Sequence, residues 1–239
     1  MHSIFVSDLH LTPERPAANA VFSRFLQGPA SSAQALYILG DLFEAWVGDD
    51  DLDDRFNASI ADALRALSGK GVALHFMHGN RDVLAGDRFV RRCGASVIPD
   101  PLLIDLHGTR TLLMHGDTLC TDDVEYQKFR AYAHDEANQR RFLAQPLAAR
   151  KEQMLGMRAD SERSKQAKTA EIMDVAPAAV EQALREHGYP RLIHGHTHRP
   201  GRHVHVVDGR TCERWVLTDW YGRAGYLRCD EAGCTPVGL

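Results

Sequence analysis

The chain has 239 residues, 44% of them hydrophobic, so it can bury one full-sized core, and one domain with an insertion is as plausible as two domains. Its net charge of -4 and pI near 6.3 argue against a general nucleic-acid binder, although the average can hide a local basic surface. The N-terminus lacks the long apolar stretch of a signal peptide, and no later run approaches the ~20 apolar residues of a membrane span. We therefore expect a cytosolic protein, which can meet a membrane only from the cytoplasmic surface.

The five cysteines are widely spread and include no Cys-x-x-Cys pair, which excludes a zinc ribbon. An odd number in this arrangement is typical of a cytosolic protein, so we expect reduced thiols. The five are Cys93, Cys120, Cys212, Cys229 and Cys234.

The first predicted strand is followed by two side chains of metal-ligand type. Residues 3–7 predict a strand that ends before Asp8 and His10, which share one face in extended backbone. Apolar residues at helical spacing in residues 16–28, followed by an apolar run at 37–40, then predict a βαβ unit.

The second predicted strand stops on Gly40 and Asp41. Because glycine permits a tight turn, Asp41 is expected at the carboxyl end of a sheet, where α/β folds place ligands. Taken alone, Gly-Asp after a strand is more often a plain turn. A predicted helix at 55–69 then leads to a third buried strand at 72–78, which ends before Asn80.

A short predicted helix at 87–93 precedes a pair of apolar runs. Residues 102–106 and 110–114 flank a turn at 107–109 and so predict a hairpin, whose second strand ends on His115.

Residues 122–169 show a different pattern, helical and amphipathic, and indicate an insertion. Between positions 139 and 168, eight basic residues stand against three acidic ones, a net charge of +5. The basic residues are Arg140, Arg141, Arg150, Lys151, Arg158, Arg163, Lys165 and Lys168. The apolar residues include Tyr126, Phe129, Tyr132, Phe142, Leu143, Leu147, Met154, Leu155 and Met157.

Strand patterns return after the insertion. A strand at 191–194 is followed by His196 and His198, and an alternating run at 203–207 with a second run at 212–218 predicts another hairpin.

Side chains that bind metals thus follow five predicted strands. Singly, each is better explained as a helix cap or a turn residue. Five such sets are harder to explain as independent turns, because carboxylate, imidazole and amide oxygen together make a dinuclear site for Mn, Fe or Zn. The set comprises Asp8, His10, Asp41, Asn80, His115, His196 and His198.

In this order the residues resemble the calcineurin-like metallophosphoesterases, whose blocks are Asp-x-His, Gly-Asp, Gly-Asn-(His/Arg)-(Asp/Glu), His and Gly-His-x-His. The matching blocks are Asp8-Leu9-His10, Gly40-Asp41, Gly79-Asn80-Arg81-Asp82, His115 and Gly195-His196-Thr197-His198. The resemblance implies two metals per chain, with Asp41 bridging both. One metal would be held by Asp8, His10, Asp41 and His198, and the other by Asp41, Asn80, His115 and His196.

The chain is more closely similar to one branch, the UDP-2,3-diacylglucosamine diphosphatases of lipid A synthesis. The similarity covers essentially the whole chain and rests on residues 40–50, on residues 115–123, and on Arg81, where the wider superfamily usually has histidine. It implies hydrolysis of the pyrophosphate bond of UDP-2,3-diacylglucosamine to 2,3-diacylglucosamine 1-phosphate (lipid X) and UMP, with two Mn²⁺ per chain.

The same resemblance implies catalytic roles for Asn80, Arg81 and His196. Substrate contacts are implied for Asn80, Arg81, Asp123, Ser161, Lys165, Lys168 and His196. Lys165 stands where the family carries asparagine, and a lysine there can still reach a phosphate.

The residues themselves favour an anhydride as substrate. Two cations ~3.5–4 Å apart would lower the pKa of a shared water and clamp the attacking and leaving oxygens during in-line displacement at phosphorus. Arginine stays protonated and so cannot act as a proton donor, whereas an alkoxide leaving group needs one. Arg81 therefore indicates a leaving group that needs little protonation, such as a phosphate, while its charge compensates the phosphoryl oxygens.

The insertion has two interpretations. Apolar residues at helical spacing are more often core than ligand-contacting. The accompanying positive charge favours a lid that holds acyl chains on one side and faces an anionic bilayer or phosphates on the other.

The resemblance implies an α/β fold of two packed mixed sheets flanked by helices, with an inserted helical cap; periodicity alone supports only α/β with hairpins. We expect residues 1–121 and 170–239 to form the core and 122–169 the lid. The expected partners are a lipid-linked UDP-sugar and the cytoplasmic face of the inner membrane, on which the protein is peripheral, with no nucleic acid and no obligate protein partner. Two other functions remain open: a phosphoesterase acting on a soluble nucleotide or phosphoprotein, and a metal-free binding scaffold, which the intact ligand set disfavours.

Overall fold

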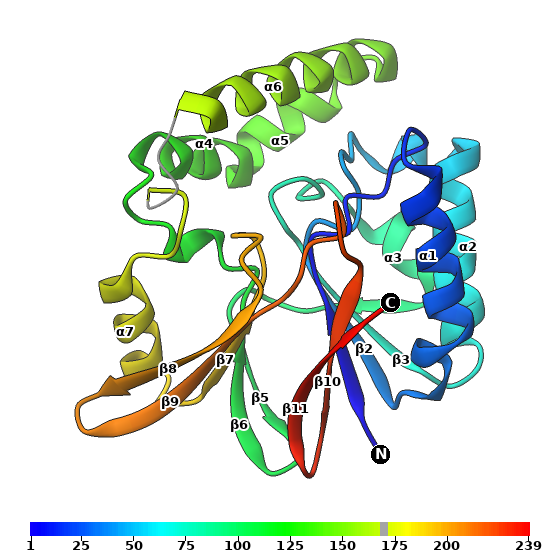
Figure 1. Ribbon diagram of the computed structural model, residues 1–239. Helices are drawn as coiled ribbons and strands as arrows, with labels where there is room; N and C mark the ends of the chain where they lie inside the picture. Colours follow the sequence, from blue (N-terminus) through cyan, green and yellow to red (C-terminus); the bar gives the residue numbers. More distant parts are fainter. Residues whose placement is uncertain (168–171) are drawn as a thin grey trace.

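The computed structural model describes residues 1–167 and 172–239, and the strands in this part of the chain form two mixed sheets packed against each other (Figure 1). The strand order is β11-β10-β1-β2-β3-β4 in the first sheet and β5-β6-β7-β9-β8 in the second. The first sheet contains β1 (Ser3–Val6), β2 (Ala35–Leu39), β3 (Ala73–Met77), β4 (Ala95–Val97), β10 (Gly225–Asp230) and β11 (Gly233–Gly238). The second contains β5 (Leu102–Leu106), β6 (Thr109–Leu113), β7 (Arg191–His194), β8 (Gly201–Val207) and β9 (Arg210–Val216).

Parallel pairing brings strand ends together. β1, β2, β3 and β4 run parallel, with Phe5 opposite Tyr37 and Tyr37 opposite His75. β6, β7 and β9 also run parallel in the second sheet. The carboxyl ends of β1, β2 and β3 therefore meet at one edge of the first sheet, and those of β6 and β7 meet at one edge of the second. The two predicted hairpins are confirmed, because β5 pairs with β6 and β8 with β9 in antiparallel register.

Helices cover the outer faces of the two sheets. Figure 1 shows α1 (Pro16–Gln27), α2 (Arg55–Ser68) and α3 (Asp87–Cys93) against the first sheet, and α7 (Pro177–Glu186) beside β8 and β9. Helix α1 starts with Pro16, whose fixed φ suits a first turn, and Asp54 caps α2 by accepting from two backbone N–H groups.

Three apolar clusters hold these layers together. One lies between α1–α3 and the first sheet and contains Phe22, Phe25 and Phe89, and another joins α7 to the second sheet. The third lies between the sheets, where Phe5 and Leu39 from one share a cluster with Ile193 from the other. This central cluster brings the polar edges of both sheets side by side.

Three helices form the predicted cap: α4 (Val124–His134), α5 (Glu136–Leu143) and α6 (Leu147–Ala167). Asp123 and Asp135 start α4 and α5, because each side chain accepts a hydrogen bond from a backbone N–H in the first turn. Figure 1 shows α4, α5 and α6 beyond the strand ends. Short 3₁₀ helices occupy Pro29–Ser32, Asp49–Asp53 and Asp117–Leu119. Among the described helices, none has the length and apolar content needed to cross a membrane.

Four regular elements were not predicted from the sequence: β4, α7, β10 and β11. Strand β11 contains two glycines and Pro236, which are depleted in strands, but it forms the edge of its sheet, where a proline needs no ladder partner. Helix α7 starts at Pro177 and buries Val180, Ala183 and Leu184 at helical spacing.

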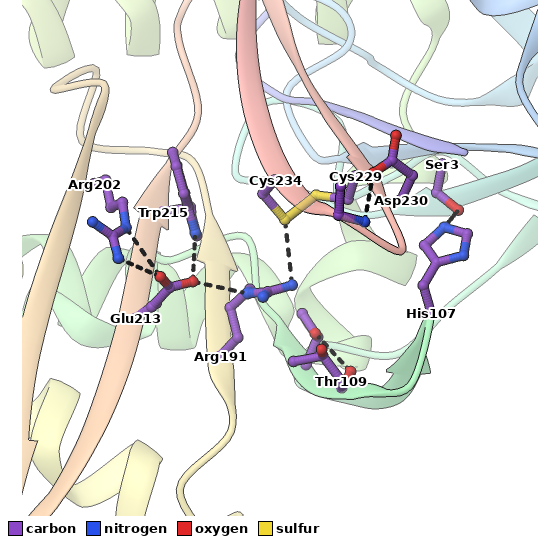
Figure 2. The surroundings of a disulfide bond; sticks show 12 residues. Ser3, His107, Thr109, Arg191, Arg202, Glu213, Trp215, Cys229, Asp230 and Cys234 are labelled. Atoms are coloured by element: carbon purple, nitrogen blue, oxygen red, sulfur yellow. Dashed lines mark hydrogen bonds and ion pairs between the residues drawn. A yellow bond between two sulfur atoms is a disulfide. The ribbon is translucent and has the colours of Figure 1, made fainter. Parts of the chain in front are cut away.

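The expectation of reduced thiols is wrong for two of the five cysteines. Cys229 and Cys234 are directly opposite in the β10–β11 pair and form a disulfide, with their Cα atoms 4.1 Å apart (Figure 2). Arg191 donates to the sulfur of Cys234 at 3.4 Å and to Glu213 at 3.2 Å. The pairing was missed because β11 was not predicted, so the register that brings the two cysteines together was not visible. The other three cysteines are free and buried.

Candidate active site

The seven candidate ligands all follow strands whose carboxyl ends meet between the two sheets. Asp8 and His10 follow β1, Asp41 follows β2, and Asn80 follows β3. From the second sheet, His115 follows β6, and His196 and His198 follow β7. The structure thus brings together every metal ligand that the sequence predicted.

One cluster contains Asp8, His10 and His198, with one oxygen of Asp41. The Nε2 atoms of His10 and His198 are 3.3 Å apart, and that of His198 is 3.3 Å from Asp8 Oδ1. His10 Nε2 lies 3.9 Å from both Asp8 Oδ1 and Asp41 Oδ2. Two imidazole nitrogens and two carboxylate oxygens therefore converge on one point.

A second cluster uses the other oxygen of Asp41. His115 Nε2 lies 3.9 Å from Asp41 Oδ1 and 3.2 Å from the side-chain oxygen of Asn80. That same amide oxygen is 3.1 Å from Nδ1 of His196. Asp41 stands between the two clusters and offers one oxygen to each.

The backbone at these ligands is unusual. In the described part of the chain, eight non-glycine residues have left-handed backbone, and five of them are candidate ligands with φ between 48° and 68°. Such conformations are sparsely populated and concentrate at functional sites. The five are Asp8, His10, Asp41, His196 and His198.

Glycines allow the ligand loops to approach closely. A side chain at Gly40 would come within 2.5 Å of His115 Nδ1, and one at Gly79 would collide with the carboxylate of Asp41. The strand-to-loop turns can therefore converge only where the sequence supplies glycine.

Buried groups behind the ligands fix their orientation. Asp82 accepts hydrogen bonds from the backbone N–H groups of Gly79 and Leu42, each at 2.8 Å. Ser7 donates to Asp8 Oδ2 at 2.7 Å, while His115 Nδ1 lies 2.8 Å from the carbonyl of Leu39. Because a carbonyl only accepts, Nδ1 of His115 carries the proton and Nε2 is directed at Asp41 and Asn80.

The electrostatics of the site reflect crowded carboxylates in a buried space. Burial raises the pKa of Asp41 to about 7, and the nearby charges of Asp82 and Asp8 act in the same direction. Burial opposes the charged form of His115, but the surrounding carboxylates outweigh it and raise its pKa to about 9. Burial lowers the pKa of His196 to about 3, so this ring is neutral at pH 7 and keeps a lone pair for coordination.

This donor set fits divalent cations. Carboxylate, imidazole and amide oxygen are ligands of intermediate hardness, suited to Mn²⁺, Fe²⁺ or Zn²⁺. At Asn80 and His196, the amide oxygen faces a ring that burial keeps neutral, and at Asp41 the carboxylate faces two imidazoles. A cation placed among these donors would take the place of the positive charge that the carboxylates stabilise on protonated His115.

A cavity of about 800 Å³ separates the two clusters from the cap. His10, Asp41, Asn80 and His196 contribute to its lining on the core side, next to Arg81. The cap supplies largely apolar walls, namely Tyr126, Phe129, Tyr132, Phe142, Met154 and Met157. Leu143 and Leu147, which also belong to the predicted apolar stripe, do not line it. The cavity therefore joins a polar floor to an apolar roof.

The structure places most of the implied substrate contacts in this cavity. Asn80, Arg81, Asp123, Ser161 and His196 line it. The buried Nε of Arg81 has no hydrogen-bond partner among the described residues, so it can donate to an anionic group. Lys168 lies outside the described residues, as does the side chain of Lys165.

Part of the cap's positive charge holds the cap on the core, a role that the sequence did not reveal. Three basic residues of α6 form ion pairs with carboxylates in the segment after β2, two of them at 2.6 Å and 3.1 Å. The pairs are Arg150–Asp50, Lys151–Asp51 and Arg158–Glu44.

Sequence reasoning also missed two residues beside the ligands. Glu44 Oε2 lies 3.5 Å from His10 Nδ1, and the ring of Tyr221 stacks on His10 with centroids 4.8 Å apart. Glu44 stands in the run that carries the family resemblance, which is a usable signal. Tyr221 lies in an irregular loop between β9 and β10, where no pattern marks it.

Known proteins similar in sequence to this chain belong to the same family that its motifs resemble. Residues 1–200 match the calcineurin-like phosphoesterase family. A UDP-2,3-diacylglucosamine hydrolase of Aromatoleum aromaticum is 58% identical over 239 residues, covering 100% of this chain and 97% of that protein. Proteins of the same name from Stenotrophomonas maltophilia and Xanthomonas campestris pv. campestris are 48% and 49% identical over 98% of this chain and 96% and 97% of their own lengths. The chain belongs to the calcineurin-like phosphoesterases and, within them, to the family of the UDP-2,3-diacylglucosamine hydrolases.

Proposed function

We propose that this chain hydrolyses the pyrophosphate bond of UDP-2,3-diacylglucosamine, giving 2,3-diacylglucosamine 1-phosphate and UMP. One observation carries the proposal: the two ligand clusters that share Asp41 face a cavity whose opposite wall is apolar and belongs to the cap. A substrate with a pyrophosphate at one end and acyl chains at the other matches both surfaces. The full-length relatives named for this substrate support the same assignment.

The residues around the floor would divide the work. When bound, two cations would lower the pKa of a water molecule and polarise the phosphoryl oxygens. Asn80 and His196 would hold the cation of the second cluster. Arg81 would donate to the phosphoryl oxygens as negative charge develops there. Asp123 and Ser161 would contact the rest of the substrate, together with Lys165 and Lys168.

The proposed cations are two Mn²⁺. The ligand set contains no thiolate, and this favours Mn²⁺ over softer metal ions. Later metals of the series nevertheless have higher intrinsic affinity for such ligands. Chelation should abolish turnover, and Mn²⁺ addition should restore it. A chelated protein that remains fully active would contradict any metal mechanism, and the absence of bound metal after loading would favour the scaffold interpretation.

Residues 122–169 would act as a lid over the acyl chains. The competing substrate class, a soluble nucleotide or phosphoprotein, has no use for the apolar wall formed by Phe129, Phe142 and Met154. Product analysis with UDP-2,3-diacylglucosamine, a soluble UDP-sugar and a phosphomonoester distinguishes a lipid-linked substrate from a soluble one. A clear preference for the lipid supports the proposal, and equal turnover of the soluble UDP-sugar contradicts it.

The proposed attack is on the phosphorus next to uridine, with the acylated glucosamine phosphate as leaving group. Hydrolysis in ¹⁸O-labelled water should then place the label in UMP. Label in the lipid phosphate would overturn the assigned site of attack.

We also propose that the cap contacts the cytoplasmic face of the inner membrane. Its surface exposes Val124 and Leu155, and exposed basic side chains of the cap helices include Lys128 and Arg141. Apolar residues beside basic ones favour binding to an anionic bilayer. Co-sedimentation should therefore be stronger with anionic vesicles than with neutral ones, and equal recovery from both would contradict this contact.

A further inference from the structure

The carboxylate of Glu44 is buried at a junction of three parts of the molecule. Its side chain is only 7% exposed. It faces His10 from the loop after β1, Tyr221 from the loop between β9 and β10, and Arg158 from α6 of the cap. His10 and Tyr221 both face Oε2, while Arg158 faces Oε1, so the two oxygens of one carboxylate connect all three neighbours.

The contact with His10 concerns the ring nitrogen that faces away from the ligand cluster. Nε2 of His10 lies among Asp8, Asp41 and His198, whereas Nδ1 lies 3.5 Å from Glu44 Oε2, which is within ion-pair distance but does not meet the geometry of a hydrogen bond. A carboxylate on the second nitrogen of a ligating histidine fixes the tautomer and the ring orientation, and it strengthens the metal bond.

Tyr221 restrains the same pair from another side. Its hydroxyl donates to Glu44 Oε2 at 2.6 Å, and its ring stacks on the imidazole of His10 at an interplanar angle of 26°. The guanidinium of Arg15 lies 4.4 Å from the centroid of the Tyr221 ring. Carboxylate, phenol and imidazole therefore form one packed unit.

The remaining oxygen of Glu44 faces the cap. Arg158 Nη2 lies 3.1 Å from Glu44 Oε1, and Arg158 also lines the substrate cavity. Within the described ranges, three ion pairs join α6 to the segment after β2. In the Arg158–Glu44 pair, the carboxylate also faces the candidate ligand His10. The Lys151–Asp51 pair forms a comparable bridge two turns earlier in α6.

From these contacts we propose that Glu44 is a positioning residue: it orients His10 as a ligand of the first cation and, through Arg158, links that cation site to the position of α6. The inference rests on the proposed dinuclear metal site. Losing Glu44 should weaken the first cation while leaving the second intact, because the second cluster has no contact with Glu44 among the described residues. Losing Arg158 should have a smaller effect in the same direction, since Glu44 would lose one of its two fixed oxygens.

The test is to titrate Mn²⁺ into the chelated protein without substrate. Calorimetry and electron paramagnetic resonance measure the binding of each Mn²⁺. Glu44→Gln should raise the Kd of one Mn²⁺ by roughly 10–100-fold and leave the other unchanged. Arg158→Met should raise the same Kd in the parent chain but cause no further change in Glu44→Gln. Lys151→Met is the matched control, because it removes an ion pair of the same helix without touching Glu44, and its two Kd values should equal those of the parent.

Unchanged Mn²⁺ affinities in a folded Glu44→Gln variant would overturn the proposal. If that variant does not fold, Arg158→Met still decides the link to α6, because its side chain is one third exposed and an unchanged Kd there would refute the link. A shift of equal size in Lys151→Met would also refute it, by showing that any loosening of the cap has the same effect. Because no substrate is present, a chain that shows these shifts but does not hydrolyse UDP-2,3-diacylglucosamine would contradict the proposed function alone.

Discussion

Arg150 in the cap forms an ion pair with Asp50 in the core, and its side chain is only 2% exposed although that of Asp50 is 57% exposed. The guanidinium also donates to the backbone carbonyls of Val47 and Gln145. A buried cation bound on both sides of the cap–core boundary acts as an anchor for α6.

Arg150→Ala should therefore loosen the cap. The variant leaves two carbonyls without their donor and creates a cavity, at a cost of roughly 2–4 kcal/mol. Hydrogen exchange should show faster exchange in α5 and α6 but not in the sheets. Arg140→Ala is the control, because the Arg140–Glu136 pair is exposed and such pairs contribute about 0–1 kcal/mol. Equal exchange in both variants would contradict the anchor.

Asp41 offers one oxygen to each ligand cluster, so its loss should affect both proposed cations. After chelation and loading with limiting Mn²⁺, we expect Asp41→Ala to retain less metal than His10→Ala, which alters one cluster. Metal analysis after gel filtration measures this difference, and kcat/KM should be lower in Asp41→Ala by roughly tenfold or more. Full activity of Asp41→Ala at saturating Mn²⁺ would rule out a shared ligand.

Arg81 should matter for charge and not for proton donation. Arg81→Ala should lower kcat by roughly 10²–10³-fold, as for other lost donors to a developing oxyanion. Arg81→His should gain relative activity on phosphomonoesters, whose alkoxide needs a proton. Steady-state kinetics on both substrate types provide the measurement, and equal losses on the two would argue against this role.

The apolar wall of the cavity should contribute binding of acyl chains. Met154→Ser or Phe142→Ser should raise KM for the diacylated substrate, since full burial of such a side chain is worth ~1.5–3 kcal/mol. Metal content should stay the same. Leu147→Ser is the control on the same helix as Met154, because Leu147 does not line the cavity and is not part of the proposed membrane contact. If KM is unchanged in the cavity variants and their folding is impaired, the insertion is structural core.

Asp100 should make the stability of the chelated protein depend on pH. Its carboxylate accepts from the backbone N–H of His115, and burial raises its pKa from 3.8 to about 6. Between these values the folded protein holds a proton that the unfolded chain has lost, so stability falls as pH rises through that window.

Asp100→Asn removes this titration while keeping an acceptor. Its stability relative to the parent should therefore increase by about 1.4 kcal/mol from pH 5 to pH 8, at 1.36 kcal/mol per pH unit up to the folded pKa. Urea unfolding at the two pH values measures the difference. A constant offset between the two proteins would show that Asp100 does not titrate in this range.

The sequence predicted which candidate ligands lie at strand ends, because the signals for those strand ends were local. Asp41 and Asn80 each follow an apolar run that stops on a glycine or a short polar turn, and the structure places both at strand ends. The hairpin of β8 and β9 was equally clear, because alternation and a turn at Asp208 and Gly209 mark it within a few residues.

The missed features depend on contacts between distant segments. Glu44 and Tyr221 are 177 residues apart, and nothing in either neighbourhood indicates that they meet. The disulfide partner of Cys229 depended on β11, whose glycines and proline conceal a strand that only pairing stabilises. The charges of Arg150 and Arg158 were visible, but their partners in the core were not.

The left-handed backbone at the ligands has a consequence for engineering. Asp8, His10 and Asp41 hold conformations that cost an L-residue about 1–2 kcal/mol and that glycine adopts freely. A library screened only for thermal stability would therefore tend to select glycine at these positions. Such variants would gain stability but lose the candidate ligands and, with them, activity. Any search for a hardier variant of this enzyme has to score turnover and thermal tolerance in the same round.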